Sequence, residues 1–465
     1  MKIYLRLFAL AVTASLTLNV ARAQSVAPFK TGDRVVFLGN SITDGGHYHS
    51  YIWLYYMTHF PNMRFTCHNA GIGGDNVKQM SDRLEDEVLP MRPTVLTVTW
   101  GMNDTGYFEW FGGDAKEKGQ KNVDLAKSRY AVLEAKLKKL PNIKKINILG
   151  SPYDETTNSN KNNLYKGKAA AFSQLIDFQE ASAKNNGWGV VDFFHPMTDI
   201  NTREQARNPD FSLTPGDRVH PDNDGHMVMA YQFLKTQGLA NKVVADVAIN
   251  AANKQVSKAV NCSIKNVAGT TDRITFDYLA NSLPYAADTM VRGWGNKKRQ
   301  SDALAYVPFA KEFNQELLTV KGLKAGNYQL MIDNEVISSY SSDQLSEGIN
   351  LAENPYTPQY QQAIQIRELN EERWDIERRF RQYAFIQFDL LKEKGLLYKD
   401  DRAAVDTVNK ESIKNAFVRG NKDNYLKARY KNIRQAWQKQ MDVLIDQIYT
   451  INKPLNHKVT LQLVK

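Results

Sequence analysis

The sequence predicts an α/β protein whose first half is a doubly wound parallel sheet of five strands with helices on both faces. The main observation is that short β-like runs alternate with amphipathic helical stretches from Phe29 to about Leu239. After Ala248 the pattern changes to β-like pieces and then to long helical segments, which predicts a small β-sandwich-like domain interrupted by a helical hairpin. At 465 residues the chain is also longer than one hydrophobic core usually supports, so several domains are expected.

The first domain is expected over residues 24–245. Asp124 to Leu140 and Leu164 to Lys184 have helical periodicity and few helix-breaking residues. Between and around them lie five candidate strands, namely Arg34–Leu38, Met63–His68, Thr94–Thr99, Lys145–Leu149 and Gly189–Asp192.

A β-rich domain is expected over residues 246–353. Its candidate strands are Ala259–Val267, Arg273–Leu279 and Leu317–Ile332, the last of which alternates around a glycine-containing turn. A final alternating run, His457 to Val464, would complete the same domain with residues 455–465. The segment between them is then an insertion in the β domain.

That insertion, residues 354–454, carries the clearest helical signal. Apolar residues recur in steps of three and four along two segments, which predicts a pair of helices joined by a polar stretch from Lys392 to Asn424. The first helix also carries arginines and glutamates that read as a solvated, ion-paired face, with binding of acidic glycans as the alternative. These charged residues are Arg373, Arg378, Arg379, Arg381, Glu371, Glu372 and Glu377.

The first residues have the pattern of an export signal. Lys2 and Arg6 precede the apolar stretch Leu7 to Val20, and Ala21-Arg22-Ala23 supplies small residues at a cleavage site. We expect residues 1–23 to be a signal peptide and the mature protein to be periplasmic or extracellular. No later segment is expected to span a membrane.

The charge of the chain bears on its expected partners. The net charge of +10 favours acidic partners, among them acidic polysaccharides, although a basic surface that only serves solvation is an equal interpretation. No nucleic-acid-binding motif accompanies the charge.

Only Cys67 and Cys262 are present, so no disulfide framework is expected, and Cys67 is interpreted as a buried, inert thiol.

A serine and a histidine segment together suggest a catalytic triad. The apolar run Val35 to Leu38 ends in Gly39-Asn40-Ser41, and the carboxyl ends of parallel strands are where ligands bind. Far along the chain, Asp217-Arg218-Val219-His220 offers a base and an acid that holds its ring. Neither segment is informative alone.

Two further segments follow strands two and three, Asn69 to Asn76 and Trp100 to Asp104. A glycine amide and an asparagine side-chain amide there are suitable donors for an oxyanion. The four segments, in this order, resemble the four blocks of the SGNH or GDSL hydrolase family of esterases and lipases. One difference is Asn40, where the family often has Asp before the serine.

The resemblance implies a specific set of roles. Ser41 would be the nucleophile, His220 the base and Asp217 the residue that orients the imidazole. The oxyanion donors would be the amides of Ser41 and Gly74 and the side chain of Asn103. Such a mechanism requires no metal or organic cofactor, and we expect none.

Other residues near the blocks are weaker candidates. His47 and His49 have a spacing compatible with a metal, but no third ligand is identifiable. Asp222 to Gly225 is interpreted as a helix cap rather than a calcium loop. Aromatic residues that follow Ser41 and Asn103 suggest a carbohydrate-stacking platform or, equally, core packing. From these segments we expect His47, Tyr48, Tyr107 and Trp110 to contact substrate.

These expectations favour an exported esterase that removes O-acetyl or another small acyl group from a polysaccharide or oligosaccharide. A lipase or lysophospholipase-like acylhydrolase is the second hypothesis, and it requires an apolar acyl groove. A third is a non-catalytic glycan-binding or surface-assembly protein. The sequence leaves the glycan, the ester position and the oligomeric state open.

Overall fold

The first domain contains the expected parallel sheet. The computed structural model describes residues 26–293 and 295–464, so the expected signal peptide lies outside the described residues. The strand order is β2-β1-β3-β4-β5, and every neighbouring pair is parallel. The strands are β1 (Arg34–Gly39), β2 (Thr66–Gly71), β3 (Val95–Val98), β4 (Lys144–Leu149) and β5 (Gly189–Asp192).

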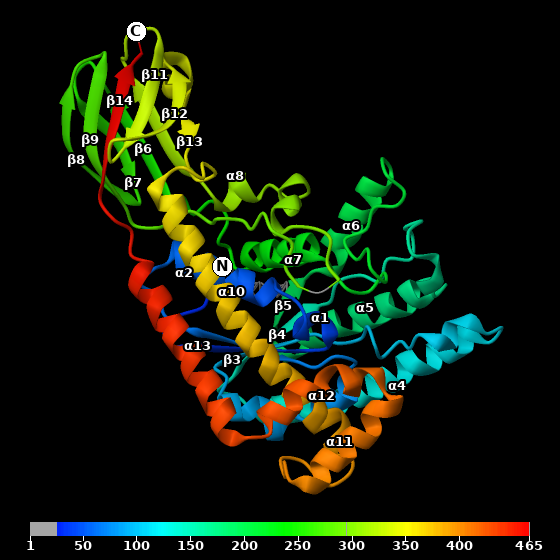
Figure 1. Cartoon of the computed structure of the whole chain (residues 1–465). Coiled ribbons are helices and arrows are strands. Elements are labelled where there is room, and N and C mark those ends of the chain that lie inside the picture. Colours follow the sequence, from blue (N-terminus) through cyan, green and yellow to red (C-terminus); the bar gives the residue numbers. More distant parts are fainter. Residues whose placement is uncertain (1–25, 294, 465) are drawn as a thin grey trace, which may run out of the picture.

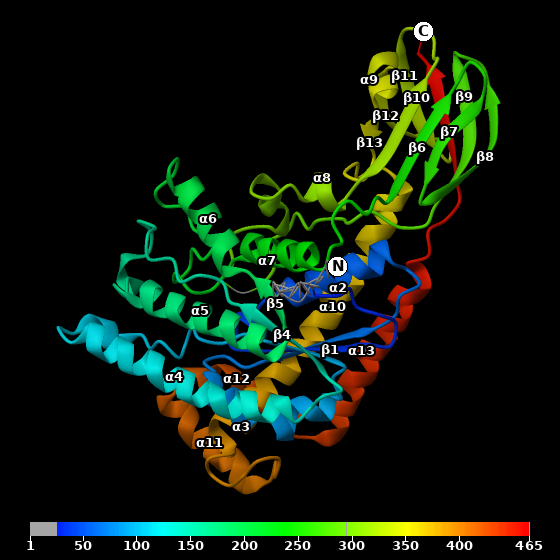
Figure 2. The ribbon, with the colours of Figure 1, turned by 180° about the vertical axis from the view of Figure 1, so that it is seen from behind.

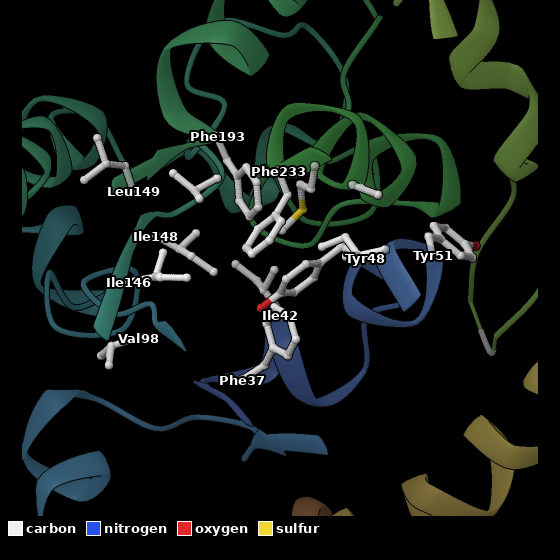
Figure 3. Close-up of a cluster of buried hydrophobic side chains, with 14 of the residues drawn as sticks. Phe37, Ile42, Tyr48, Tyr51, Val98, Ile146, Ile148, Leu149, Phe193 and Phe233 are labelled. Atoms are coloured by element: carbon white, nitrogen blue, oxygen red, sulfur yellow. The ribbon is translucent and has the colours of Figure 1, made fainter. Parts of the chain in front are cut away.

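Helices cover both faces of this sheet (Figures 1 and 2). On one face lie α2 (Tyr48–His59) and α7 (Asn223–Thr236), and on the other α4 (Ala115–Lys138) and α5 (Lys168–Asn186). Figure 3 shows how side chains from β1, α2 and α7 meet above the sheet, with Phe37, Tyr48 and Phe233 in one apolar cluster. The predicted doubly wound fold is confirmed.

The second domain is a sandwich of two sheets that share one apolar core. One sheet has the order β13-β10-β6-β7 and the other β12-β11-β14-β9-β8. The expected strand 259–267 is in fact two strands, because Asn261 adopts a left-handed backbone with φ +56° and turns the chain between the sheets. The strands are β6 (Ala245–Asn250), β7 (Gln255–Val260), β8 (Cys262–Gly269), β9 (Arg273–Ala280), β10 (Glu316–Lys321), β11 (Asn327–Ile332), β12 (Glu335–Ser341), β13 (Ile349–Asn350) and β14 (His457–Leu463).

The last strand completes this sandwich, as the sequence predicts. β14 lies between β9 and β11 and pairs with both in antiparallel register. The helical segment before it is therefore an insertion in the β domain. The long helices α10 (Pro358–Phe385) and α13 (Lys431–Ile451) run side by side (Figures 1 and 2).

The connection between those two helices differs from the expected polar stretch. It contains α11 (Arg402–Lys414) and α12 (Ala416–Ala428), whose buried faces form a separate apolar core with the end of α10. Asp401 and Asn415 cap the two helices by accepting hydrogen bonds from backbone amides. One end of the insertion thus has a separate apolar cluster, to which Ile72 of the glycine segment also contributes.

The insertion also packs on the sheet domain. All twelve residues of α2 are buried, because the sheet lies on one side of this helix and α10 on the other. The Trp53 indole donates to the Tyr449 hydroxyl at 3.3 Å, and the Asn452 amide donates to the Met57 carbonyl at 2.9 Å. The sheet domain and the insertion therefore share an extensive buried contact.

Both cysteines in the structure are free thiols, and burial raises the pKa of the Cys67 thiol well above its usual range. Within residues 26–293 and 295–464, we find no helix with the length and apolar character needed to cross a membrane.

Candidate active site

Ser41 lies where β1 turns into the short helix α1 (Ser41–Asp44). The Asn40 side chain caps this helix by accepting a hydrogen bond from the Ile42 amide at 3.0 Å. Gly39 is required at the turn, because a Cβ there would lie 2.2 Å from the Thr43 hydroxyl. The serine hydroxyl therefore stands at the carboxyl edge of the sheet, half-buried rather than enclosed.

The structure brings the three predicted catalytic side chains together. His220 Nε2 lies 2.7 Å from Ser41 Oγ, and His220 Nδ1 lies 2.5 Å from Asp217 Oδ2. The other carboxylate oxygen of Asp217 accepts hydrogen bonds from the amides of Val219 and His220. With the ring proton on Nδ1, the Nε2 lone pair faces the serine hydroxyl, which is the arrangement that a general base requires.

Asp217 is ionised in this arrangement. Burial raises its pKa, but the hydrogen bond and electrostatic attraction of His220, with the amides of His220 and Val219, lower it more, so the pKa of Asp217 falls below its usual value. The carboxylate can thus stabilise an imidazolium formed during the reaction.

The glycine and asparagine segments meet beside Ser41. Asn103 Nδ2 donates to the Asp75 carbonyl at 2.8 Å, and no acceptor among the described residues takes the second hydrogen of this amide. Gly74 has φ +87°, a left-handed conformation that favours glycine. The Asp104 carboxylate accepts from the amides of Gly101 and Val77 at 2.9 Å, so it ties the two segments to each other.

Two buried arginines that the sequence analysis did not single out hold these segments in place. Arg83 donates to the carbonyls of Gly39 and Ala70 and pairs with Asp75 at 2.7 Å, which joins the serine and glycine segments. Arg218, inside the histidine segment, donates to four carbonyls of a distant loop, those of Asp154, Thr157, Ser159 and Asn160. Both arginines bind mainly backbone carbonyls, which every residue has. No pattern of residue types in the sequence therefore indicates these contacts.

Three of the four expected substrate contacts are not available in this structure. His47 and Tyr48 are completely buried, the first stacked on Trp374 with ring centroids 3.8 Å apart and the second inside the apolar cluster of Figure 3. Trp110 is also buried and donates to the Thr105 carbonyl at 3.0 Å. These side chains pack the core, which was the alternative for aromatic residues near the blocks. Tyr107 is half-buried and contacts Asn103.

The helical insertion reaches the site from behind. Glu377 Oε1 accepts a hydrogen bond from the Asn69 amide at 2.9 Å, and Arg381 pairs with Glu87 at 2.5 Å beneath the glycine segment. Arg373 is buried too and pairs with Glu377 at 2.9 Å. The expectation of a solvated charged face is therefore wrong for these residues, which form an internal ion-paired contact between two domains.

The segment that follows His220 caps a helix, as expected. The Asp222 side chain accepts from the Asn223 amide at the start of α7 and from the amides of Lys297 and Lys298. The connection from β9 to β10 thereby covers the back of the histidine segment.

In the part of the chain that the structure describes, no group of three or more His, Cys, Asp or Glu side chains is arranged to hold a metal ion.

Comparison with known proteins finds related esterases. Residues 37–228 match the GDSL-like lipase/acylhydrolase family, and residues 364–453 match the diltiazem deacetylase C-terminal helical domain. An acetylxylan esterase from Geobacillus stearothermophilus is 25% identical over 227 residues, which are 45% of this chain and 95% of that protein. The structure of a gut microbial diltiazem-metabolizing enzyme is 48% identical, with 95% of this chain and 100% of that chain covered and a TM-score of 0.93. The second similarity therefore includes the sandwich and the helical insertion.

Proposed function

Because the chain belongs to the GDSL-like lipase/acylhydrolase family, we propose that this esterase hydrolyses acetyl esters with Ser41 as its nucleophile. The observation that carries the proposal is the continuous hydrogen-bonded chain from Ser41 through His220 to Asp217, at 2.7 and 2.5 Å. In this order the three groups supply the nucleophile, the general base and the carboxylate that orients the base, which are the roles that acyl transfer requires.

The proposed reaction has two halves. In the first, His220 Nε2 takes the Ser41 proton as Oγ forms a bond to the ester carbonyl, and the negative charge on the carbonyl oxygen is held by the amides of Ser41 and Gly74 and by the Asn103 side chain. The carbon–oxygen bond to the alcohol then breaks, and the alcohol leaves with the proton from His220. In the second half, water gives a proton to the same base as its oxygen bonds to the acetyl carbon. The bond from that carbon to Ser41 Oγ then breaks, Oγ takes the proton back from His220, and acetic acid leaves.

We propose an O-acetylated carbohydrate as the first substrate class. The support is the relative named as an acetylxylan esterase and the open position of the triad, in which the His220 side chain is 46% exposed and the alcohol part of a large substrate has room. A lipase-like function would need an enclosed apolar groove for a long acyl chain. The side chains that the structure places in contact with Ser41 and its base are polar and partly exposed, namely His220 and Asp217.

A small aromatic acetyl ester is the second candidate substrate. Two observations favour it: the similarity to a diltiazem-metabolizing enzyme extends over nearly the whole chain, and the segment after Asn103 presents Phe108 and Phe111 to solvent, 81% and 60% exposed. Exposed aromatic side chains at the rim of a site can stack on a flat substrate.

Acetate release tests both candidates. The mature protein is incubated with acetylated xylans, pectins and mannans, with aryl acetates, with diltiazem and with long-chain esters, and Ser41→Ala is the control. The expected result is acetate release that Ser41→Ala abolishes, and the panel then identifies the alcohol class. If the folded protein releases no acid from any ester, the proposed function is wrong and a glycan-binding role becomes the better explanation.

A further inference from the structure

The Asn103 side chain is fixed by hydrogen bonds at both ends of its amide. Its nitrogen donates to the Asp75 carbonyl at 2.8 Å, and its oxygen accepts from the Tyr107 hydroxyl at 2.7 Å. The Asp75 carbonyl can only accept, so the amide cannot rotate by half a turn without losing this bond. One N–H of Asn103 is thereby used for anchoring, and the other has a fixed direction.

A buried lysine holds the loop on both sides of Asn103. Lys168, at the start of α5, is completely buried, and its Nζ donates to the Met102 carbonyl at 2.7 Å and to the Thr105 hydroxyl and the Gly106 carbonyl at 2.6 Å. These three acceptors flank Asn103 in sequence. Among the described residues, none of the hydrogen-bond partners of this ammonium group is a carboxylate.

Lys168 also contacts the tyrosine. Its Nζ lies 4.0 Å from the centre of the Tyr107 ring, the geometry of a cation–π interaction. A cation over the ring draws electron density from the phenol and makes its hydroxyl a stronger donor to Asn103. Burial lowers the pKa of Lys168 to about 7. The Thr105 hydroxyl donates to the Met102 carbonyl at 2.9 Å, so it can accept from Lys168, and the ammonium form has one hydrogen for each of its three acceptors.

Within residues 26–293 and 295–464 no carboxylate forms an ion pair with Lys168, and burial of such a cation is costly, so its presence calls for a reason beyond packing. We propose that Tyr107 and Lys168 are positioning residues of the oxyanion hole: they aim the free N–H of Asn103 at the carbonyl oxygen of the substrate and strengthen it as a donor. This inference rests on the proposed esterase function. Tyr107 is thus assigned to the oxyanion site rather than to a carbohydrate-stacking platform.

The test is Tyr107→Phe, which removes one hydroxyl and keeps the ring beneath Lys168. Removal of a complete oxyanion donor lowers kcat by about 100-fold or more, and loss of its support should lower kcat by about tenfold. KM for an aryl acetate should stay unchanged, because the hydrogen bond to the oxyanion strengthens only in the transition state. The matched control is Tyr153→Phe, whose hydroxyl donates to the Asn163 carbonyl and does not contact Asn103. Its kinetics should equal those of the parent enzyme.

A double-mutant cycle shows whether Tyr107 acts through Asn103. In an Asn103→Ala background, Tyr107→Phe should change kcat by less than about twofold, because there is no amide left to position. Equal losses in both backgrounds would overturn the proposal, since they would mean that the hydroxyl acts on something else. Lys168→Met should show the same pattern. Its thermal unfolding is measured in parallel, and if Lys168→Met does not fold, the Tyr107→Phe cycle alone tests the proposal.

The outcomes separate this inference from the proposed function. If the parent enzyme hydrolyses the ester and Ser41→Ala does not, the function stands, and a Tyr107→Phe variant with parental kcat overturns the positioning roles alone. If neither the parent nor any variant cleaves an ester, both fail together.

Discussion

Arg218 shows how much one side chain contributes to the histidine segment. It adopts φ +68°, a conformation that costs a non-glycine residue about 1 kcal/mol or more. Its buried guanidinium compensates by donating to four carbonyls of the loop between β4 and α5. The spacing of Asp217 and His220 is thereby tied to a part of the chain some distance away in sequence.

We expect Arg218→Met to lower both stability and activity. The substitution removes the donor of four carbonyls, two buried and two part-buried, so the free energy of unfolding should fall by about 3 kcal/mol in urea titrations. The value of kcat should fall as well, because Asp217 loses its fixed position. The control is Arg203→Met on the surface, which should change the free energy of unfolding by less than about 0.5 kcal/mol. Equal effects of the two substitutions would contradict this account.

At the level of elements, the contact of α1 with β2 is unusually close. A Cβ on Gly71 would lie 2.2 Å from the Asp44 amide nitrogen, and backbone atoms of Thr43 and Asn40 stand within 2.8 Å. These are backbone atoms of the helix that carries Ser41, so they cannot move away without moving the nucleophile. Glycine at this position therefore sets how near the serine and glycine segments come to each other.

Gly71→Ala should separate these two elements. The expected cost is about 2 kcal/mol or more in the free energy of unfolding, together with a lower kcat. Gly73→Ala is the matched variant, because its Cβ would meet only the Asp44 carboxylate at 3.5 Å, an ordinary contact. Thermal melts that place both variants at the same midpoint would argue against a special role for Gly71.

Helix α10 contributes buried charge to the same region, and this charge should make stability depend on pH. Burial raises the pKa of Glu377, but Arg373 beside it, together with the hydrogen bond from the Asn69 amide, lowers the pKa from 4.5 to about 2. A carboxylate with a lowered pKa stabilises the fold above its ordinary pKa, and this contribution is lost as the pH falls towards the lowered value.

The measurement is the free energy of unfolding of the parent and of Glu377→Gln across pH. The variant leaves Arg373 buried without its partner, so it should be less stable by about 3 kcal/mol near neutrality. The gap should shrink as the pH falls from 4.5 towards about 2, where Glu377 also becomes neutral. A gap of constant size over that range would show that the ion pair does not contribute in this way.

For the whole molecule, the helical insertion is part of the core rather than an appendage. Ile366, Ile448 and Tyr449 belong to the same apolar core as the parallel sheet. Replacement of residues 354–454 by a short flexible linker should therefore expose α2 and give an insoluble or loosely folded protein. Soluble yield and near-ultraviolet circular dichroism test this, and a well-folded, active product would contradict it.

Sequence patterns were sufficient where the determining contacts are local. The sharp turn at Ser41 and the three-residue step from Asp217 to His220 are short-range features, so they indicate the site before the fold is known. The alternation of His457 to Leu463 likewise identifies the strand that closes the sandwich.

The rest depends on contacts that a single sequence does not reveal. Arginines and glutamates at helical spacing pair in the same way on a surface and in a buried contact, so the burial of Arg373 and Glu377 becomes visible only when α10 lies on α2. The burial of His47 is equally hidden in the sequence. Its residue type and its place after Ser41 suggest ligand binding, whereas in the structure Trp374 from the insertion stacks on its ring.

The position of β14 has a consequence for the order of synthesis. Its neighbours β9 and β11 emerge from the ribosome before the helical insertion, yet they are joined only by a strand that follows it. Until then each presents an unpaired edge, and such edges can pair with other growing chains. Co-translational folding should therefore complete the sandwich last, and nascent chains that stall within the insertion should be the ones most in need of chaperones.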